Sequence, residues 1–469
     1  MFTKYINTNK NNMLDSICNL ISIPSISIET NNYKYPFGKE CNTVLKEFLL
    51  IASSLGFRVK NIDNYCGYAE FGDGKEIIGI IGHLDVVPAK EEDWEHSPFI
   101  PTIEGNYLFG RGAIDDKGPV IASLYAMKAV MDYCNDNKIN VNKRVRLIVG
   151  LNEEKNWKCI EYYKTHEELP TIGFSPDAEF PCIHAEKGVL SLSLSDKLDS
   201  RLPISILDID CANNALNVVP KYASATIKIN FNNINMNSLI DHLKNTIEIN
   251  KYEIDIYKID NKTIKLTSYG VSSHSAHPEL GNNAITKLLI IINEIYTFYK
   301  IKFPFLSTFC KYIGDNYLGT NLKIDIKDES GHLTLNTSQT YIKDNKLFIS
   351  MNLRIPVHTD LNTILNAFNK TFKDFNVNTI RWQEPLFISK DKEIVNTLCD
   401  IYNEECKTDY KPIAIGGATY ARAFNNCISF GMNFPGDEDM CHKEDEYIRI
   451  DKLILSANIY AKAIYKLLQ

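Results

Sequence analysis

Two nearly continuous apolar runs place the strongest constraint on how this chain can fold. They are "EIIGIIGHLDVV" at 76–87 and "RVRLIVGLNEE" at 144–154. Runs of this kind are typical of strands that are covered on both faces, as in a parallel sheet. The segment "GPVIASLYAMKAVMDYC" at 118–134 lies between them and has the character of a crossover helix. The sequence therefore predicts an α/β fold with a wound, mostly parallel sheet.

Both apolar runs turn polar where the predicted strands end. His83 and Asp85 end the first run, and Glu153 and Glu154 end the second. Side chains two positions apart in a strand point to the same face, so His83 and Asp85 should project together. Ligands of open α/β sheets gather outside the carboxyl ends of the strands. We therefore expect the two endings to converge on a functional site.

Further acidic and histidine residues stand in short polar segments. They are Asp115 and Asp116 in "GRGAIDDKG", Asp177 in "FSPDAEF" and His442 in "DMCHKEDE". Taken singly, a loop histidine or aspartate is more often a surface or capping residue. Adjacent carboxylates repel one another, however, and are tolerated mainly where a cation neutralises them. Together with the strand ends, they favour a centre in which one aspartate bridges two metal ions.

The length of 469 residues exceeds what one hydrophobic core usually supports, so more than one domain is expected. We assign 1–186 and 386–469 to a catalytic, metal-binding domain and 187–385 to an α+β domain inserted into it. Within the insertion, 224–247 and 346–372 each read as an alternating strand, a polar cap and an amphipathic helix. This internal repeat predicts that the inserted domain is made of two similar halves.

The charge pattern argues against nucleic acid as a partner. The net charge is −7, and no block rich in Lys and Arg is present. The N-terminal segment lacks the apolar stretch of a signal peptide, and no run is long enough to span a membrane. Twelve cysteines are scattered without a CxxC pair, which favours reduced thiols. We expect a cytoplasmic protein that binds neither nucleic acid nor membrane.

Seven segments carry a resemblance to a known family. They are "GHLDVVPA", "GRGAIDDKGP", "NEE", "GFSPDAEFP", "GVSSHSAHPELGNNA", "NLRIP" and "GGATYAR" followed by "MCH". In this order they resemble the metallopeptidase family that includes carboxypeptidase G, succinyl-diaminopimelate desuccinylase and the aminoacylases. The order of these segments and the residues within them are most similar to those of the PepV-type Xaa-His dipeptidases, or carnosinases. The resemblance spans the chain from about Asn12 to Leu467.

The resemblance implies a centre of two divalent metal ions. Asp115 corresponds to the carboxylate that bridges both ions. His83 and Asp177 would hold one ion, and Glu154 and His442 the other. Zinc is the expected metal, although a set of histidines and carboxylates also suits manganese or cobalt.

The resemblance also implies groups that act beside the metals. Glu153 matches the general acid/base, and Asp85 matches the carboxylate that fixes the tautomer and angle of His83. His274 occupies the position of a histidine in the lid domain that reaches the carbonyl oxygen under attack. The peptide bond between Asp115 and Asp116 is implied to be cis.

Residues that hold the substrate's carboxylate are implied in the same way. They are Asn217 and Arg354, with backbone donors from Gly416, Gly417 and Thr419. Without the resemblance, Arg354 reads equally well as a strand arginine that solvates a sheet face. The chain has Asn152 where the family often has Asp; this position is not a ligand, so the departure bears on substrate preference.

The function implied is hydrolysis of dipeptides with free N- and C-termini. An alternative is an N-acyl amino acid deacylase or a succinyl-diaminopimelate desuccinylase, which would use the same metals. A remote alternative is a binding protein on an inactive peptidase scaffold, but such proteins usually lose a ligand or the base, and all of these positions are filled here. Because the echoed halves would let one chain carry a complete site, we expect a monomer.

Overall fold

The computed structural model, which describes residues 1–211, 214–231 and 235–469, pairs the two apolar runs as neighbouring parallel strands. They form β3 (Ile77–His83) and β6 (Arg144–Gly150), and every residue of β3 is buried. The segment between them forms the long helix α4 (Lys117–Asp136). The predicted α/β class with a mostly parallel sheet is confirmed.

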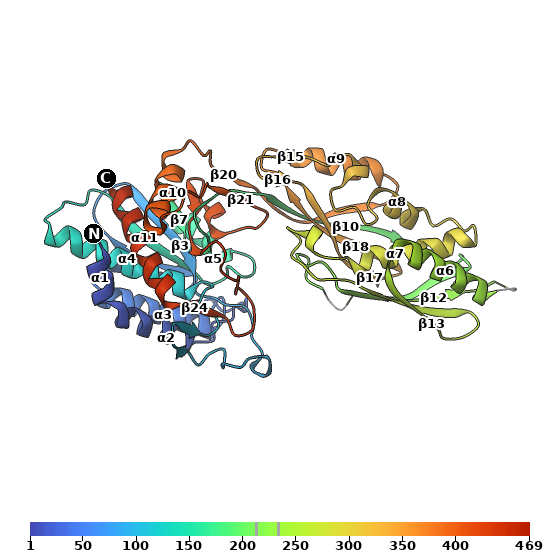
Figure 1. Ribbon diagram of the computed structural model, residues 1–469, viewed down its shortest axis with the longest axis horizontal. Coiled ribbons are helices and arrows are strands. Elements are labelled where there is room, and N and C mark those ends of the chain that lie inside the picture. The colour runs from blue at the N-terminus through green and yellow to red at the C-terminus, as the bar shows by residue number, and fades with distance from the viewer. Residues whose placement is uncertain (212–213, 232–234) are drawn as a thin grey trace. The chain divides into compact units, whose positions relative to one another are not determined.

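The chain folds into two compact units (Figure 1). Unit 1 consists of Met1–Ala185, Leu386–Ile413 and Thr419–Gln469. Unit 2 consists of Glu186–Pro385 and Ala414–Ala418. Each unit has its own hydrophobic core of buried aliphatic and aromatic side chains. None of the helices in the described part of the chain has the length and apolar character needed to cross a membrane.

The main sheet of unit 1 has the strand order β1-β2-β6-β3-β7-β22-β9-β20, with β21 also paired to β9. The central pairs β6–β3, β3–β7 and β7–β22 are parallel, whereas β1–β2, β2–β6 and β22–β9 are antiparallel. The remaining strands are β1 (Arg58–Ile62), β2 (Cys66–Phe71), β7 (Ile172–Ser175), β9 (Ile183–Glu186), β20 (Leu386–Phe387), β21 (Ile413–Ile415) and β22 (Cys427–Ser429).

Helices α4 and α11 (Ile450–Leu468) pack against each other and against β3. Gly82 of β3 allows this close approach, because a Cβ atom there would lie 2.6 Å from Val120 of α4. The other helices of unit 1 are α1 (Thr3–Thr8), α2 (Lys10–Ile21), α3 (Lys39–Ser54), α5 (Lys158–His166) and α10 (Glu393–Cys406). The short strands β8 (Ala178–Glu179) and β23 (Met432–Asn433) form a separate two-stranded sheet. The strands β4 (Thr102–Glu104), β5 (Tyr107–Phe109) and β24 (Tyr447–Arg449) form a three-stranded sheet.

Unit 2 contains two four-stranded antiparallel sheets with matching connections. One has the order β17-β18-β10-β19 and the other β11-β12-β14-β13. In each, a strand, a helix and a second strand follow in sequence, β18-α9-β19 and β12-α6-β13, and one other strand separates the two strands that the helix joins. The first strand and the helix of each segment are the parts that repeat in the sequence.

The strands of these two sheets are β10 (Gly188–Lys197), β11 (Ile204–Asp210), β12 (Tyr222–Ile229), β13 (Glu253–Lys258), β14 (Thr263–Tyr269), β17 (Thr334–Lys343), β18 (Lys346–Ile355) and β19 (Asn376–Gln383). Two short strands, β15 (Lys327–Asp328) and β16 (Gly331–His332), pair separately in the same unit. Its helices are α6 (Met236–Asn250), α7 (Ala284–Phe298), α8 (Pro304–Tyr312) and α9 (Leu361–Thr371). The polar side chains Asn235, Asn283 and Asp360 cap the N-termini of α6, α7 and α9, respectively, by accepting backbone N–H groups of the first turn.

Candidate functional site

The five predicted metal ligands all come from unit 1, from the ends of strands and the loops that follow them. His83 is the last residue of β3, and Asp115 lies two residues before α4. Glu154 follows β6, Asp177 lies between β7 and β8, and His442 lies in the loop between β23 and β24. The parallel pairing of β6, β3 and β7 therefore brings their carboxyl ends to one edge of the sheet.

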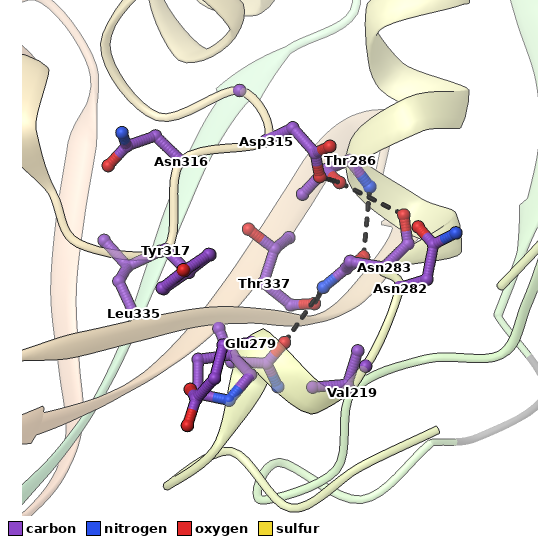
Figure 2. Close-up of a pocket in the computed structure, with 14 residues that line it drawn as sticks. Val219, Glu279, Asn282, Asn283, Thr286, Asp315, Asn316, Tyr317, Leu335 and Thr337 are labelled. Carbon is purple, nitrogen blue, oxygen red and sulfur yellow. Dashed lines mark hydrogen bonds between the residues drawn. The ribbon is translucent and has the colours of Figure 1, made fainter. Parts of the chain in front are cut away.

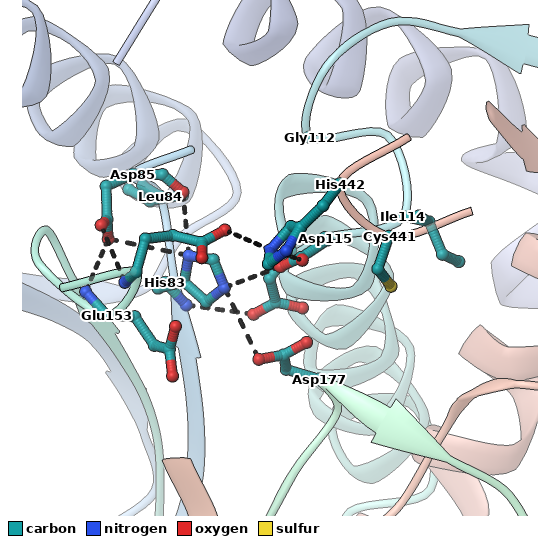
Figure 3. A network of polar contacts seen from close by, with 12 residues as sticks. His83, Leu84, Asp85, Gly112, Ile114, Asp115, Glu153, Asp177, Cys441 and His442 are labelled. Atoms are coloured by element: carbon teal, nitrogen blue, oxygen red, sulfur yellow. Dashed lines mark hydrogen bonds and ion pairs between the residues drawn. The ribbon is translucent and has the colours of Figure 1, made fainter. Parts of the chain in front are cut away.

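The two carboxylate oxygens of Asp115 each face a different histidine (Figure 3). Oδ1 lies 3.0 Å from Nε2 of His83, and Oδ2 lies 3.0 Å from Nε2 of His442. Each histidine has a second carboxylate beside it: Asp177 Oδ2 is 3.5 Å from His83 Nε2, and Glu154 Oε1 is 3.0 Å from His442 Nε2. The side chains thus form two sets that share Asp115.

Part of this cluster has the spacing of a metal site. Ligand atoms of His83, Asp115 and Glu154 all lie within 4.8 Å of one another. Imidazole nitrogens and carboxylate oxygens are the ligands that zinc and other first-row divalent ions take in proteins. The peptide bond between Asp115 and Asp116 is cis, as the resemblance implies.

The carboxylates of the cluster are costly to ionise together. Burial, followed by the nearby charge of Asp115, raises the pKa of Glu154 to about 7. The same two causes raise the pKa of Asp177 above its usual range. Burial opposes the charged form of His442, but its hydrogen bonds with Asp115 and Glu154 raise its pKa to about 11. Positive charge among these groups would therefore stabilise the ionised carboxylates.

The contact between His83 and Asp85 differs from the predicted one. The strand ends at His83, and Nδ1 of His83 lies 2.9 Å from the backbone carbonyl oxygen of Asp85, while the carboxylate is 3.6 Å away. The carboxylate instead accepts the backbone N–H groups of Glu153 and Glu154 at 3.0 and 3.2 Å. A carbonyl oxygen can only accept, so Nδ1 carries a proton and Nε2 is the ring nitrogen that faces Asp115.

Glu153, the predicted base, is held at the same edge by its backbone. Figure 3 shows its side chain beside His83 and apart from the contacts that join Asp115 to the two histidines. Burial raises its pKa well above the usual range, and the negative charges of Glu154, Asp177 and Asp85 add to this effect. A carboxylate in such surroundings binds a proton more readily than one in water.

A second group of predicted residues comes together in unit 2. The buried guanidinium of Arg354 donates to the carbonyl oxygen of Gly416 at 2.8 Å and lies 3.5 Å from Nε2 of His274. It also donates to Ser275 Oγ at 3.1 Å. Asn217 joins the group through its backbone, because its carbonyl oxygen accepts the N–H of Ser275 at 2.8 Å. Four of the predicted substrate-binding and lid residues are therefore neighbours within unit 2.

The other two predicted substrate-binding residues are placed differently. Gly417 follows Gly416 in the same short segment of unit 2, whereas Thr419 belongs to unit 1. Thr419 Oγ1 lies 2.6 Å from Ser429 Oγ and accepts the N–H of Ala421 at 3.2 Å. Its hydroxyl thus caps the short 3₁₀ helix Tyr420–Ala423.

Two residues that hold the ligand loops were missed in the sequence, Arg111 and Glu446. The buried carboxylate of Glu446 accepts three backbone N–H groups, those of Gly112, Ile114 and Asp115, at 2.9–3.2 Å. It also accepts a hydrogen bond from Nη1 of Arg111 at 2.6 Å. Arg111 in turn donates to the carbonyl oxygen of His442 at 3.4 Å and stacks over Trp94.

This arrangement ties the loop of Asp115 to the loop of His442. A signal for it exists in the arginine of "GRG" and the last glutamate of "HKEDE", each a few residues from a predicted ligand. Sequence alone did not separate Glu446 from the exposed Glu444, two positions earlier in the same acidic run. Only the fold shows that one of them is buried against backbone donors.

We predict that Glu446→Gln destabilises unit 1 by about 3–5 kcal/mol, because it leaves the buried charge of Arg111 unpaired and sets an amide N–H₂ against backbone N–H groups. The measurement is the urea midpoint of unfolding. Glu444→Gln is the matched control, since it makes the same change on an exposed side chain of the same loop. Equal midpoints for the two variants would contradict the role of Glu446.

Comparison with known proteins places the chain in a family. The family model of Peptidase family M20/M25/M40 matches residues 79–466. Protein YtjP of Bacillus subtilis (strain 168), which carries the provisional name of a dipeptidase, is 36% identical over 436 residues, with 92% of each chain covered. A provisionally named dipeptidase of Staphylococcus haemolyticus (strain JCSC1435) is 31% identical over 476 residues, covering 100% of this chain and 99% of its own.

Solved structures show the same fold at much lower identity. Human carnosine dipeptidase 1 has a TM-score of 0.60 at 14% identity, with 100% of this chain and 98% of that chain covered. The dipeptidase Dug1p of Saccharomyces cerevisiae has a TM-score of 0.58 at 14% identity, with 99% and 97% covered. The family match over most of the chain confirms the resemblance seen in the sequence. The chain belongs to Peptidase family M20/M25/M40 and is a peptidase.

Proposed function

We propose that this peptidase hydrolyses dipeptides with free N- and C-termini, with the help of two divalent metal ions. The observation that carries the proposal is the placement of Asp115, whose two carboxylate oxygens face two histidines at 3.0 Å each. Each histidine has its own second carboxylate, so the side chains form two ligand sets with one shared member. The provisional names of the two curated relatives support the dipeptide as substrate.

The residues present fit two divalent ions. His83 and Asp177 would hold one ion, Glu154 and His442 the other, and Asp115 both. Burial, and after it the charge of Asp115, raises the pKa values of Glu154 and Asp177, so their ionised forms are unfavourable without a neutralising charge. Cations between them would stabilise their ionised forms. Zinc is the metal we expect, with manganese or cobalt as alternatives that suit the same donors.

Two such ions, when bound, lower the pKa of a shared water and polarise the scissile carbonyl group. The chain's own residues then have separate tasks. Glu153 accepts the proton of the attacking water and passes it to the nitrogen of the leaving amine. Asp85 fixes the loop of Glu153 through that residue's backbone N–H, and its carbonyl oxygen holds the tautomer of His83. No nucleophilic side chain is required.

Unit 2 supplies the residues that recognise the rest of the substrate. We assign His274 to the carbonyl oxygen under attack, where an N–H donor would stabilise the developing negative charge. Arg354 and Asn217 bind the substrate's C-terminal carboxylate, and the segment of Gly416 and Gly417, with Thr419, adds backbone donors. Arg354 already orients this segment through the carbonyl oxygen of Gly416. If the bound carboxylate is the substrate's own C-terminus, the substrate we propose has one residue beyond the scissile bond.

We predict that a dipeptide is cleaved about 10- to 100-fold faster than its amide, because a hydrogen bond to a charged group contributes about 1.5–3 kcal/mol. A matching tetrapeptide should also be cleaved more slowly than the dipeptide. In Arg354→Lys the difference between acid and amide should shrink, since lysine cannot present two parallel N–H donors. The measurement is kcat/KM on all three substrates.

The matched control is Arg201→Lys, an exposed arginine of the same unit that pairs with Asp199.

The panel of substrates also includes N-acetyl and N-succinyl amino acids. It is measured on enzyme that is first treated with a chelator and then supplied with one metal at a time. Equal rates of the wild-type enzyme on dipeptide, amide and tetrapeptide would overturn the dipeptidase proposal. Preference for the acylated amino acids would assign the protein to the deacylase or desuccinylase activities instead.

A further inference from the structure

Unit 2 contains a small polar pocket that the proposed peptidase reaction does not use (Figure 2). Its volume is about 140 Å³. The walls come from the segment between Pro278 and Thr286, the loop 314–317 and the start of β17. The pocket therefore lies entirely within residues of one unit.

The lining of this pocket carries negative charge alone. Glu279 and Asp315 contribute carboxylates, and the described residues that line it include no lysine, arginine or histidine. One oxygen of Asp315 accepts the hydroxyl of Thr286 at 2.8 Å, which fixes the orientation of the carboxylate. Lys287 interacts electrostatically with Asp315, but its ammonium group lies 5.5 Å over the ring of Tyr252. Glu279 has a similar neighbour, since its Oε1 lies 3.2 Å from Nδ1 of His277. Both basic groups lie outside the lining, so a cation in the pocket would meet acceptors and no positively charged lining residue.

A buried hydroxyl in the same lining lacks a partner. Thr337 is 1% exposed, and its Oγ1 has no hydrogen-bond partner among the described residues. The nearby amide of Asn283 is already used, since it donates to the carbonyl oxygen of Thr337 at 2.8 Å and to Asn336 Oδ1 at 2.9 Å. Figure 2 shows Thr337 between Asn283 on one side and Tyr317 on the other. A buried polar group of this kind is costly unless a ligand or water completes its hydrogen bonds.

We propose that the pocket binds a small protonated primary amine. A primary ammonium group has three N–H donors and no acceptor, which matches a lining of carboxylates and a free hydroxyl oxygen. Its charge makes these hydrogen bonds stronger than neutral ones. Val219 and Leu335, which also line the pocket, provide apolar surface for a short alkyl group. A volume of about 140 Å³ is too small for most drug-sized ligands, whose pockets measure about 300–1,000 Å³.

The position of the pocket connects an occupant to the segment that carries His274. Glu279 and Asn282 in the lining belong to the same stretch, and Asn282 pairs with Val271 as an isolated β-bridge. His274, between those two residues in sequence, pairs in the same way with Val218. A bound ammonium group would therefore restrain both ends of the segment 271–283. We expect slower hydrogen exchange of its backbone amides when the pocket is filled.

The test compares methylammonium chloride with tetramethylammonium chloride at equal ionic strength, on the full-length, metal-loaded protein. Both ions carry one positive charge, but tetramethylammonium has no N–H group to donate. Binding is followed by saturation-transfer NMR on the methyl protons and by hydrogen exchange of residues 271–283. We expect a saturable response to methylammonium and none to tetramethylammonium.

Variants identify the site. Thr337→Val removes the hydroxyl with little change in volume and should raise the Kd for methylammonium about 3- to 10-fold, as for one hydrogen bond. Asp315→Asn keeps an acceptor for Thr286 and should raise the Kd about 10- to 100-fold through loss of charge. Asp241→Asn, an exposed aspartate of α6 outside the pocket, is the control with the same charge change. Equal responses to both ions, or unchanged binding in both pocket variants, would overturn the proposal whether or not the protein cleaves dipeptides.

Discussion

Glu153→Gln is expected to fold and to keep its metal content but to lose at least about 10²-fold in kcat, the usual contribution of a general base. Glutamine has nearly the same size as glutamate but cannot take up a proton at neutral pH. The backbone N–H of Glu153 is held by Asp85 at 3.0 Å, so the substitution leaves the loop in place. Because Glu153 is outside the two ligand sets of Asp115, metal binding should be unaffected. The measurements are kcat on a dipeptide and metal content by mass spectrometry.

The control for this variant is Glu161→Gln, which makes the same change on an exposed side chain of α5. It should retain full activity. A Glu153→Gln enzyme that keeps half of the wild-type kcat with both metals bound would exclude Glu153 as the base. A variant that loses metal as well as activity would instead assign Glu153 to the ligand sets.

The central sheet could be predicted because the sequence and the packing agree there. β3 is buried along its whole length, and an almost unbroken run of isoleucine and glycine is how such a strand reads. Its neighbour β6 and the crossover helix α4 follow from the same reasoning. The similarity between 224–247 and 346–372 likewise corresponds to a strand followed by a helix in each of two matching sheets, β12-α6 and β18-α9.

Other parts of the fold depend on pairings that no local pattern reveals. β20 and β21 are two or three residues long and pair with β9, which is about 200 residues earlier in the chain. Strands this short carry too few residues to show an alternating pattern. Their place in the sheet is decided by tertiary contacts, and the sequence alone could not supply it.

The candidate site shows the same division. The pattern of acidic and histidine residues identified the side chains that the structure gathers around Asp115, because strand ends and adjacent carboxylates are visible in a sequence. It failed for the hydrogen bond of His83, which goes to the carbonyl oxygen of Asp85 and not to its carboxylate. It also missed Glu446, whose backbone donors lie more than 330 positions away along the chain. Residue type places a glutamate close to a predicted ligand, but nothing in the spacing shows which glutamate contacts a distant backbone.

Asp115→Asn should have the largest effect of any single substitution, because it removes a charge that serves both ligand sets. The carboxamide oxygen can still face one histidine, but its N–H₂ group turns a donor toward the other set. Loss of a group that only orients a metal ligand costs about 10–100-fold in metal affinity, so loss of a shared ligand should cost at least about 10²-fold for each ion. Activity should fall by about 10³-fold or more, as both ions are needed for the water and for the carbonyl group.

The decisive measurement for Asp115→Asn is metal stoichiometry and affinity by calorimetry, alongside circular dichroism to verify the fold. Asp132→Asn is the control on the same part of the chain; this aspartate pairs with Lys128 on α4 and does not contact the cluster. Added metal should also raise the melting temperature of the variant less than that of the wild type. A ligand that binds the folded state stabilises it more when it binds more tightly. Two tightly bound ions in Asp115→Asn would contradict the shared role of this carboxylate. Loss of one ion with retention of the other would assign Asp115 to a single metal, with His83 or His442 as its partner but not both.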